Sequence, residues 1–353
     1  MLDLARELDH TGFDIKFYSF IPTSRCIKFG LQKKCIVSLF GIIAPFLILR
    51  RIFPKLSWIH IKVQDFIMGI FMRKCDICIS LTGYVYAPRI AQKTGAIKIM
   101  ERGSKHILEQ KKILEKNPHK KNEAIPNRNI KCNLKAYQFA NFISVASQHV
   151  KESFLLHQYP ENRIFVNPYG VDLSMFKPLP NIPKKYDVIM VGGWGYEKGC
   201  DLIVEAIRKT NYSFIHVGSI KDVDFPQEKN FTHIDPVDQS KLIEYYNQAK
   251  VFILPSRQDG FGMVLSQALA CNLPIIGSNN CGAPDLKKMV ELPEYITIIK
   301  DYTADAIVTA IHTAIKNYEQ LGERIYAGNA IENLTWEAYG KRYANFLHKI
   351  IKQ

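Results

Sequence analysis

The sequence predicts an α/β protein with two Rossmann-like domains, each built on a parallel sheet, and three observations support this. Short apolar runs typical of buried strands alternate with amphipathic helical segments along most of the chain. The length of 353 residues is enough for two such domains, each with its own core. Residues 251–285 have the pattern of a strand, a glycine loop, a helix and a second strand. That order is the βαβ unit of a doubly wound sheet.

The chain opens with a helical pattern over residues 1–8 and a strand pattern over 13–18. An apolar run of 15 residues, 35–49, then lies between two clusters of Lys and Arg. A helix of that length rises about 22 Å, less than the roughly 30 Å hydrocarbon core of a bilayer. The wider stretch 25–55 therefore predicts either a contact with an anionic membrane surface or a buried helix of the N-terminal domain.

Two loops in the first half follow predicted strands over 75–81 and 96–100. In open α/β sheets, ligands bind beyond the carboxyl ends of the strands, so these loops are candidate cleft segments. The first loop contains Gly83, and the second combines glycine, hydroxyl and cationic groups. The candidates in the second loop are Arg102, Gly103, Ser104 and His106.

The rest of the first half continues the α/β pattern. The lysine-rich segment 109–128 is predicted to be solvated. A strand over 143–147 ends at Ser147, which is expected to cap a helix over 148–156. Residues 175–183 contain three prolines and are predicted to link the two domains.

The second half begins with a strand over 186–191, a glycine turn over 192–199 and a helix over 200–208. A glycine turn between a strand and a helix cradles phosphate, and a lysine there adds a positive charge. The candidate phosphate-binding residues are Gly192, Gly193 and Lys198.

Further strands are predicted over 214–218 and 231–234, and helices over 239–249 and 336–351. The pattern in 251–285 places Pro255-Ser256, Asp259 and a glycine loop before a helix over 263–271. The glycines let a ligand approach the backbone, and the first N–H groups of the helix suit an anion. The loop residues are Gly260, Phe261 and Gly262, and Gln267 lies in the helix.

This segment resembles the donor-nucleotide half of retaining glycosyltransferases of the GT-B fold, family 4 (glycosyl transferases group 1). Their pattern is Pro-Ser, an acidic residue, Gly-Phe-Gly and a second acidic residue eight positions after the first. Here Asp259 and Gln267 stand where the family usually has two glutamates. The resemblance implies that Asp259 orients the transferred sugar, that Gln267 binds the ribose and that Val237 lies near the base.

The same resemblance assigns roles to the other candidates. Lys198 matches the lysine that binds the donor diphosphate, whereas Gly193 replaces an arginine for which Arg257 is a candidate substitute. Arg102 takes the place of a histidine that faces the donor sugar, and Tyr169 lies in a turn that borders the cleft. The implied catalytic residues are Asp259, Lys198 and Arg102. The implied reaction uses a nucleoside diphosphate sugar, no cofactor and no metal, with the leaving diphosphate taking the acceptor proton.

The resemblance also divides the chain into three parts. Residues 1–174 are expected to form an N-terminal acceptor-binding domain, residues 175–335 a donor-binding domain, and residues 336–353 a helix that packs back on the first domain. In the family, a first strand and a glycine-rich loop precede the opening helix. Neither is found before residues 1–8, so we expect either that the natural chain starts further upstream, which is the preferred alternative, or that this copy lacks a central strand of the N-terminal sheet.

Charge and cysteine content limit the partners and the compartment. The net charge of +14 lies entirely in the first half, since residues 1–180 contain 28 Lys and Arg against 13 Asp and Glu. This asymmetry suits an anionic membrane surface or a lipid diphosphate, and no nucleic-acid module is recognised. The eight cysteines are expected to be reduced, with Cys75 and Cys78 in the core rather than at a metal. The D-x-D sequence at 222–224 is attributed to chance.

The sequence therefore predicts a retaining glycosyltransferase that acts on a glycan or lipid-linked acceptor in surface polysaccharide biosynthesis. We expect a cytoplasmic location, with peripheral binding to the inner face of the cell membrane through residues 25–55. Two alternatives stay open. One is an inactive GT-B copy that binds a nucleotide sugar or a partner protein, and the other is a basic protein that binds a membrane surface.

Overall fold

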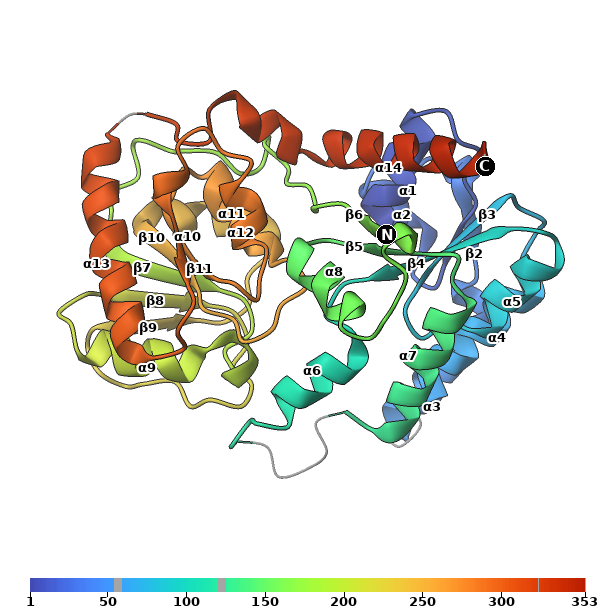
Figure 1. Ribbon diagram of the computed structural model, residues 1–353, viewed down its shortest axis with the longest axis horizontal. Helices are drawn as coiled ribbons and strands as arrows, with labels where there is room; N and C mark the ends of the chain where they lie inside the picture. Colours follow the sequence, from blue (N-terminus) through green and yellow to red (C-terminus); the bar gives the residue numbers. More distant parts are fainter. Residues whose placement is uncertain (54–58, 120–124, 323, 353) are drawn as a thin grey trace.

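Two parallel sheets, one in each half of the chain, organise this computed structural model, which describes residues 1–53, 59–119, 125–322 and 324–352. Figure 1 shows the two halves as separate α/β lobes, with the C-terminal helix α14 running from one to the other. The predicted fold class is confirmed.

The C-terminal sheet has six parallel strands in the order β12-β11-β10-β7-β8-β9. Its central strands are buried on both faces, as the uninterrupted apolar runs predict: Val188, Phe252 and Ile253 are fully inaccessible to solvent. The strands are β7 (Tyr186–Val191), β8 (Phe214–Val217), β9 (Phe231–Ile234), β10 (Ala249–Leu254), β11 (Ile275–Ser278) and β12 (Ile296–Ile299).

Helices complete this domain, most of them between two consecutive strands and the longest after the last strand. They are α9 (Cys200–Arg208), α10 (Leu242–Gln248), α11 (Met263–Ala270), α12 (Ala283–Lys287) and α13 (Ala304–Leu321), with 3₁₀ turns η4 (Tyr196–Lys198), η5 (Gln239–Lys241), η6 (Pro293–Tyr295) and η7 (Gly328–Leu334). The helix predicted over 239–249 is thus divided into η5 and α10.

The N-terminal half contains a four-stranded parallel sheet, β3-β4-β5-β6, and a separate parallel pair, β1-β2. The four strands are β3 (Ile77–Leu81), β4 (Ile97–Arg102), β5 (Phe142–Val145) and β6 (Ile164–Val166), and the pair is β1 (Phe17–Ser19) and β2 (Ile36–Ser38). The helices are α1 (Leu2–His10), α2 (Thr23–Lys28), α3 (Phe40–Ile52), α4 (His60–Phe71), α5 (Tyr86–Lys93), α6 (Ile107–Leu114), α7 (Asn127–Phe139) and α8 (Gln148–Leu155), with 3₁₀ turns η1 (Lys33–Cys35) and η3 (Glu161–Arg163).

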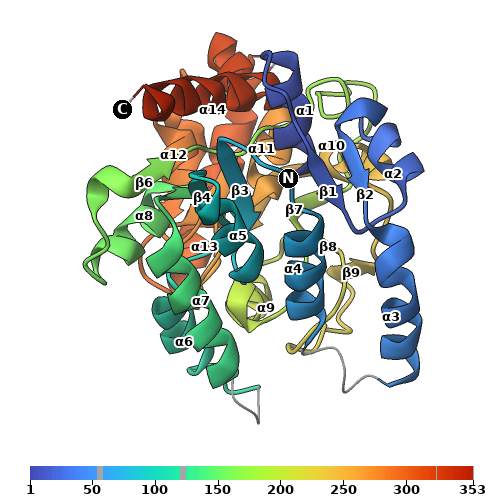
Figure 2. The same ribbon diagram turned by 90° about the vertical axis from the view of Figure 1, so that its right-hand side faces the viewer.

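A groove of about 380 Å³ separates the β1-β2 pair from β3. Phe17 and Tyr18 of β1 line one side, and Ile77 and Ile79 of β3 line the other. Figure 2 shows the amino terminus close to the space between these strands.

The C-terminal helix α14 (Trp336–Ile351) packs on α1 and on the N-terminal sheet, as the fold class predicts. Leu4, Leu8, Leu347 and Ile350 share a buried cluster at this contact. Helix α14 therefore joins the two halves through its apolar face.

Helices α3 and α4 carry an unusual number of exposed apolar side chains. Only Ile43 of α3 is buried, so the alternative of a buried helix within residues 25–55 is wrong. The first part of the apolar run forms η1 and β2, and α3 continues through Pro45. No helix in the described part of the chain is long and apolar enough to cross a membrane.

Other local expectations differ from the structure in detail. The strand pattern over 13–18 yields only the short strand β1. The lysine-rich segment 109–128 contains most of α6 and the start of α7, while its residues 120–124 lie outside the described residues. The same holds for residues 54 and 55 of the expected membrane segment.

Candidate functional site

The loop after β4 meets the loop after β10 where the two domains face each other. A Cβ on Gly260 would lie only 1.9 Å from the carbonyl oxygen of Gly103 and 3.1 Å from the nitrogen of Ser104. Beside this contact, the Ser147 hydroxyl donates a 2.5 Å hydrogen bond to the Gly260 carbonyl. Gly103, Ser104 and Gly260 are therefore brought together as the sequence predicts, and any side chain at 260 would push the loops apart.

Ser147 has a different role from the predicted helix cap. It occupies the N-cap position of α8, but its hydroxyl makes no capping bond and instead crosses to Gly260. Its neighbour His149 reaches the same loop, with Nε2 2.7 Å from the carbonyl oxygen of Asp259. The start of α8 thus binds the backbone of the Asp259 loop through two hydrogen bonds.

Lys198 and Asp259 form an ion pair between the two predicted donor loops of the C-terminal domain. The lysine Nζ lies 2.5 Å from the carboxylate Oδ2, and each side chain is less than a fifth exposed. Burial opposes the positive charge, but the Asp259 carboxylate outweighs it and raises the pKa of Lys198. Lys198 therefore stays positively charged at neutral pH.

Glycine brings the two loops of this ion pair close to each other. Gly199 has a left-handed φ of +75°, and a Cβ there would lie 2.4 Å from the carbonyl oxygen of Pro255. Gly262, with φ of +80°, begins α11, and a Cβ there would lie 3.4 Å from Asp259 Oδ2. Helix α11 therefore starts beside the Asp259 carboxylate, where its first N–H groups favour an anionic ligand.

Tyr169 and Phe261 occupy the seam between the domains. Their rings meet edge to face with centroids 5.9 Å apart, and Phe261 is buried. The Tyr169 hydroxyl would lie 3.5 Å from a Cβ on Gly103. Burial raises the pKa of the Tyr169 hydroxyl, which keeps it neutral beside both loops.

Several buried polar atoms of the Asp259 segment lack a partner. Among the described residues, four buried side-chain polar atoms make no hydrogen bond, and three of these lie between 256 and 266. They are Ser256 Oγ, Gln258 Oε1 and Ser266 Oγ. Because buried polar atoms are normally paired, this concentration is unusual and lies in the segment that carries Asp259.

Gln267 is buried in α11, and its Oε1 accepts a 2.9 Å hydrogen bond from the hydroxyl of Tyr246. Val237 lies in the loop after β9 and is half-buried against the C-terminal core. Gly192 and Gly193 form the turn after β7, where Gly192 has φ of +129°. The proposed contacts of these residues with ribose, base and diphosphate stay predictions.

Arg102 and His106 are engaged within the N-terminal domain. The Arg102 guanidinium donates to the backbone oxygens of Ser104 and Lys105 and to the side chains of Gln110 and Asn133. Through these bonds Arg102 fixes the conformation of the loop that contacts Gly260. A direct contact of Arg102 with the substrate stays a prediction.

His106 is buried, and burial lowers its pKa to about 3. Its ring stacks on His157 at 4.0 Å. Gly83 also faces its own domain, since its carbonyl accepts from Cys132 Sγ and a Cβ there would contact Ile61. The proposed cleft roles of His106 and Gly83 are therefore untested.

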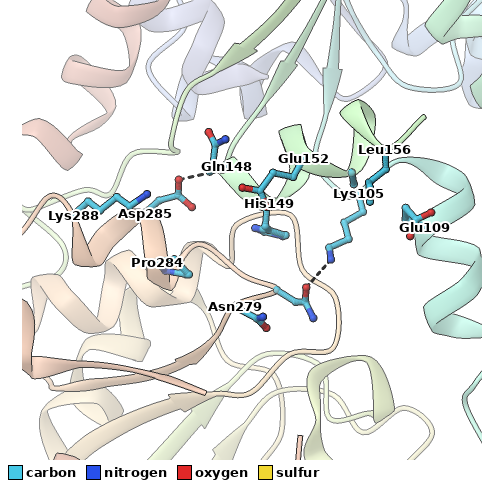
Figure 3. A pocket seen from close by; sticks show the side chains of 12 residues that line it. Lys105, Glu109, Gln148, His149, Glu152, Leu156, Asn279, Pro284, Asp285 and Lys288 are labelled. Carbon is cyan, nitrogen blue, oxygen red and sulfur yellow. Dashed lines mark hydrogen bonds between the residues drawn. The ribbon is translucent and has the colours of Figure 1, made fainter. Parts of the chain in front are cut away.

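Behind the Asp259 loop lies a pocket of about 310 Å³ that both domains line (Figure 3). Lys105 Nζ crosses it to Asn280 Oδ1 at 2.6 Å, and the backbone nitrogen of Gln148 donates to Asp285 Oδ1 at 3.1 Å. Burial raises the pKa of Asp285. These contacts fix the domains against each other next to the candidate site.

Sequence reasoning missed Lys105, His149 and Asn280 as contacts between the domains. They lie directly beside predicted loops, but no motif marks them, because their partners are more than 100 positions away along the chain. In the sequence, only their positions after a predicted strand or loop could have marked these three residues as candidates.

Two further sequence patterns, Cys75-x-x-Cys78 and the D-x-D sequence, have the following surroundings in the structure. Cys75 and Cys78 are free thiols, and Cys78 is buried. In the D-x-D sequence, Asp222 accepts hydrogen bonds from the Tyr196 nitrogen and from Asn117. Within the described residues, no three His, Cys, Asp or Glu side chains are grouped to hold a metal ion.

Comparison with known proteins finds a family match in the C-terminal domain, which contains the Lys198–Asp259 ion pair. Residues 174–330 match the family described as "Glycosyl transferases group 1". The chain is 26% identical over 242 residues to a probable sucrose-phosphate synthase of Thermosipho melanesiensis, covering 61% of this chain and 56% of that protein. It is 23% identical to a GDP-mannose-dependent phosphatidylinositol monomannoside mannosyltransferase of Mycolicibacterium smegmatis, covering 59% and 62%. The match thus spans little more than half the length of these relatives.

Solved structures resemble the whole chain. Anabaena HepE, crystallised with UDP and glucose, has a TM-score of 0.65 at 12% identity and covers 98% of this chain and 95% of its own. Sucrose-phosphate synthase of Thermosynechococcus elongatus has a TM-score of 0.62 at 14% identity and covers 99% and 92%. At such identities, the likeness establishes the fold. Residues 174–330 therefore belong to glycosyl transferases group 1, and the chain as a whole has the GT-B fold.

Proposed function

We propose that this protein is a retaining glycosyltransferase of family 4 that transfers a sugar from a nucleoside diphosphate sugar to a glycan or lipid-linked acceptor. The observation that carries the proposal is the Lys198–Asp259 ion pair, which lies between two glycine turns at the carboxyl edge of the C-terminal sheet. Ligands of open α/β sheets bind at that edge.

The nucleotide is proposed from the structural neighbours. HepE was crystallised with UDP and with UDP-glucose, and the pneumococcal O-GlcNAc transferase GtfA with UDP and GlcNAc. UDP-sugars are therefore the first donors to test, followed by GDP-mannose, the donor of the Mycolicibacterium relative.

In the proposed reaction, the bond between the sugar C1 and the diphosphate oxygen breaks, and the diphosphate leaves with the electron pair. The acceptor oxygen attacks C1 from the same face, and its proton passes to the leaving diphosphate. Negative charge develops on the diphosphate, so Lys198 and the N–H groups at the start of α11 are the proposed stabilisers. Asp259 would hold Lys198 and orient the sugar. No metal takes part in this proposal.

The test begins with ligand binding. A nucleoside diphosphate at 100 times its dissociation constant stabilises the fold by about 2.7 kcal/mol, which gives a clear thermal shift. The nucleotide that produces a shift then selects the sugar donor for a transfer assay. If no nucleoside diphosphate binds the folded protein, the proposal fails. Binding without transfer or donor hydrolysis would support an inactive copy instead.

Lys198→Ala tests the ion pair directly. We expect turnover to fall by about tenfold to a thousandfold, because one stabiliser of the leaving diphosphate is lost. Lys209→Ala is the matched control, since Lys209 forms an exposed ion pair with Asp305 on the surface of the same domain. Unchanged turnover of the Lys198 variant in a folded protein would remove Lys198 from the mechanism.

We further propose a role in surface polysaccharide biosynthesis at the cytoplasmic face of the cell membrane. The exposed apolar side chains of α3 and α4 and the basic first half of the chain support this location. A lipid-linked acceptor would then be reached from the N-terminal domain.

A further inference from the structure

The glycine turn after β7 carries a lysine that sequence reasoning did not identify. A Cβ on Gly193 would lie 2.3 Å from Cε and 2.8 Å from Nζ of Lys221, so the Lys221 side chain fills the space above this glycine. Lys221 comes from the loop after β8, 28 positions further along the chain. The ammonium group therefore lies directly on the turn that opens toward α9.

The backbone fixes this placement. The Lys221 nitrogen donates a 2.9 Å hydrogen bond to the Trp194 carbonyl, and the Trp194 nitrogen donates a 2.8 Å bond to the Ser219 carbonyl. Trp194 is fully buried. Below it, a Cβ on Gly218 would lie 2.0 Å from the Gly192 carbonyl oxygen, so the two loops touch. The backbone of Lys221 is thus fixed by these hydrogen bonds and contacts, while its side chain is exposed.

The other cations near this turn are already engaged. Arg257, the substitute considered from the sequence, makes two bonds of 2.5 and 2.7 Å to the Asp201 carboxylate and stacks on the Tyr196 ring. Lys198 is paired with Asp259. In contrast, Lys221 makes no ion pair or side-chain hydrogen bond with any residue in the described ranges.

We propose that Lys221 binds the diphosphate of the donor from the opposite side of the glycine turn to Lys198. A strand-to-helix glycine turn at the carboxyl edge of a parallel sheet favours phosphate, and an exposed ammonium there adds an unpaired positive charge. This inference rests on the proposed function and adds a residue to its binding site. Lys221 belongs to donor binding, so its loss acts on affinity and on turnover together.

The experiment measures the dissociation constants of UDP and uridine for the wild-type protein and its variants, with GDP and guanosine if UDP does not bind. For Lys221→Ala we expect diphosphate affinity to fall about tenfold to a hundredfold, the usual range for losing a charged hydrogen bond. Nucleoside affinity should stay the same, since the base and ribose do not contact the lysine. Lys229→Ala, an exposed lysine in the same domain, is the matched control and should change neither constant.

A second variant tests the position of the charge. An arginine at Gly193 would collide with the Lys221 side chain but has space once that side chain is shortened, and Gly193 does not have a positive φ. The double variant Gly193→Arg, Lys221→Ala should therefore regain most of the diphosphate affinity that Lys221→Ala loses. Gly193→Arg alone, which keeps Lys221, is the reference for this comparison.

The outcomes separate the two proposals. If UDP or GDP binds the wild-type protein and Lys221→Ala binds it equally well or more tightly, the role of Lys221 is wrong while the proposed function stands. An equal loss for nucleotide and nucleoside would also overturn it, since that would be a general structural effect. If no nucleotide binds the wild-type protein, both proposals fail.

Discussion

Three buried histidines are held in their neutral form by the fold. His106, His149 and His216 are at most 8% exposed. Burial lowers the pKa of His106 to about 3, and those of His149 and His216 to about 4. Each one meets a backbone group: His149 contacts Asp259, His216 contacts Gly192, and His106 caps α6. Two of these contacts hold loops of the candidate site.

We expect this protein to lose stability as the pH falls from about 6.5 toward 4. An unfolded histidine binds a proton near pH 6.5, whereas these folded histidines stay neutral until about pH 4 or below. The unfolded state therefore binds more protons in this window, and the free energy of unfolding decreases. At pH 5 the expected loss is about 2 kcal/mol for each histidine, measured by urea unfolding at pH 7 and pH 5.

His106→Phe provides the comparison, since a phenyl ring can keep the packing against Phe154 but cannot take up a proton. Between pH 7 and pH 5 the free energy of unfolding of this variant should decrease by about 2 kcal/mol less than that of the wild-type protein, which is the contribution of one histidine. His312→Phe, at an exposed position, should leave the pH dependence as it is. An equal slope in all three proteins would contradict the assignment.

At the scale of elements, helix α14 is attached to the N-terminal domain by several polar contacts within a largely apolar interface, and two of them are buried. The Tyr343 hydroxyl donates a 2.6 Å hydrogen bond to the Glu101 carboxylate at the end of β4. Burial raises the pKa of Glu101, and the hydroxyl partly offsets this. The residue after Glu101 is Arg102, which braces the loop that meets Gly260. The contact therefore links the C-terminal helix to the domain seam.

Tyr343→Phe should lower the free energy of unfolding by about 1–3 kcal/mol, because the buried Glu101 carboxylate loses its donor while the ring packing is kept. Urea unfolding at neutral pH measures the change. Tyr212→Phe serves as the control, since its hydroxyl meets His312 at an exposed position and its loss should cost less. A Tyr343 variant as stable as the wild-type protein would mean that the hydrogen bond to Glu101 does not stabilise the attachment of α14.

At the scale of the whole molecule, charge and apolar surface coincide on the N-terminal domain. Helices α3 and α4 are in contact through the stacked rings of Phe46 and His60. Both helices expose large apolar side chains, and Arg50 and Arg51 lie at the end of α3. The exposed apolar residues of this α3–α4 surface are Ile42, Ile48, Leu49, Ile52, Phe53, Ile61, Phe66, Ile70 and Phe71. Such a surface, basic and apolar together, suits an anionic bilayer.

We expect the protein to sediment with vesicles that contain phosphatidylglycerol and not with vesicles of phosphatidylcholine alone, and to be released by salt. Each Lys or Arg near the surface contributes about 1 kcal/mol of attraction. The double variant Ile48→Ser, Ile52→Ser should reduce sedimentation at low salt, because it removes apolar side chains without changing charge. Leu156→Ser, at the exposed position directly after α8, should not reduce it. Equal sedimentation of the double variant would exclude the α3–α4 surface as the contact.

Both sheets of the fold could be predicted from the sequence because their strands are buried on both faces. The strands Tyr186–Val191 and Phe231–Ile234 and the helices Cys200–Arg208 and Trp336–Ile351 have the predicted bounds. Predictions were less accurate where the pattern is ambiguous. The apolar run 35–49 contains η1, β2 and most of α3, and periodicity alone does not separate a strand from a helix in a continuous apolar run.

The sequence by itself determined where the candidate site lies in the C-terminal domain, because loops at the ends of neighbouring parallel strands must converge at one edge of the sheet. Asp259, Lys198 and the glycines around them could be proposed from motif and spacing alone. Only the tertiary structure decided which side chains complete the site. Lys221 lies on Gly193, Arg257 is bound to Asp201, and Ser147 reaches Gly260. The physical reason is that these contacts join different loops or different domains, and their geometry depends on how whole elements pack, which local sequence patterns do not encode.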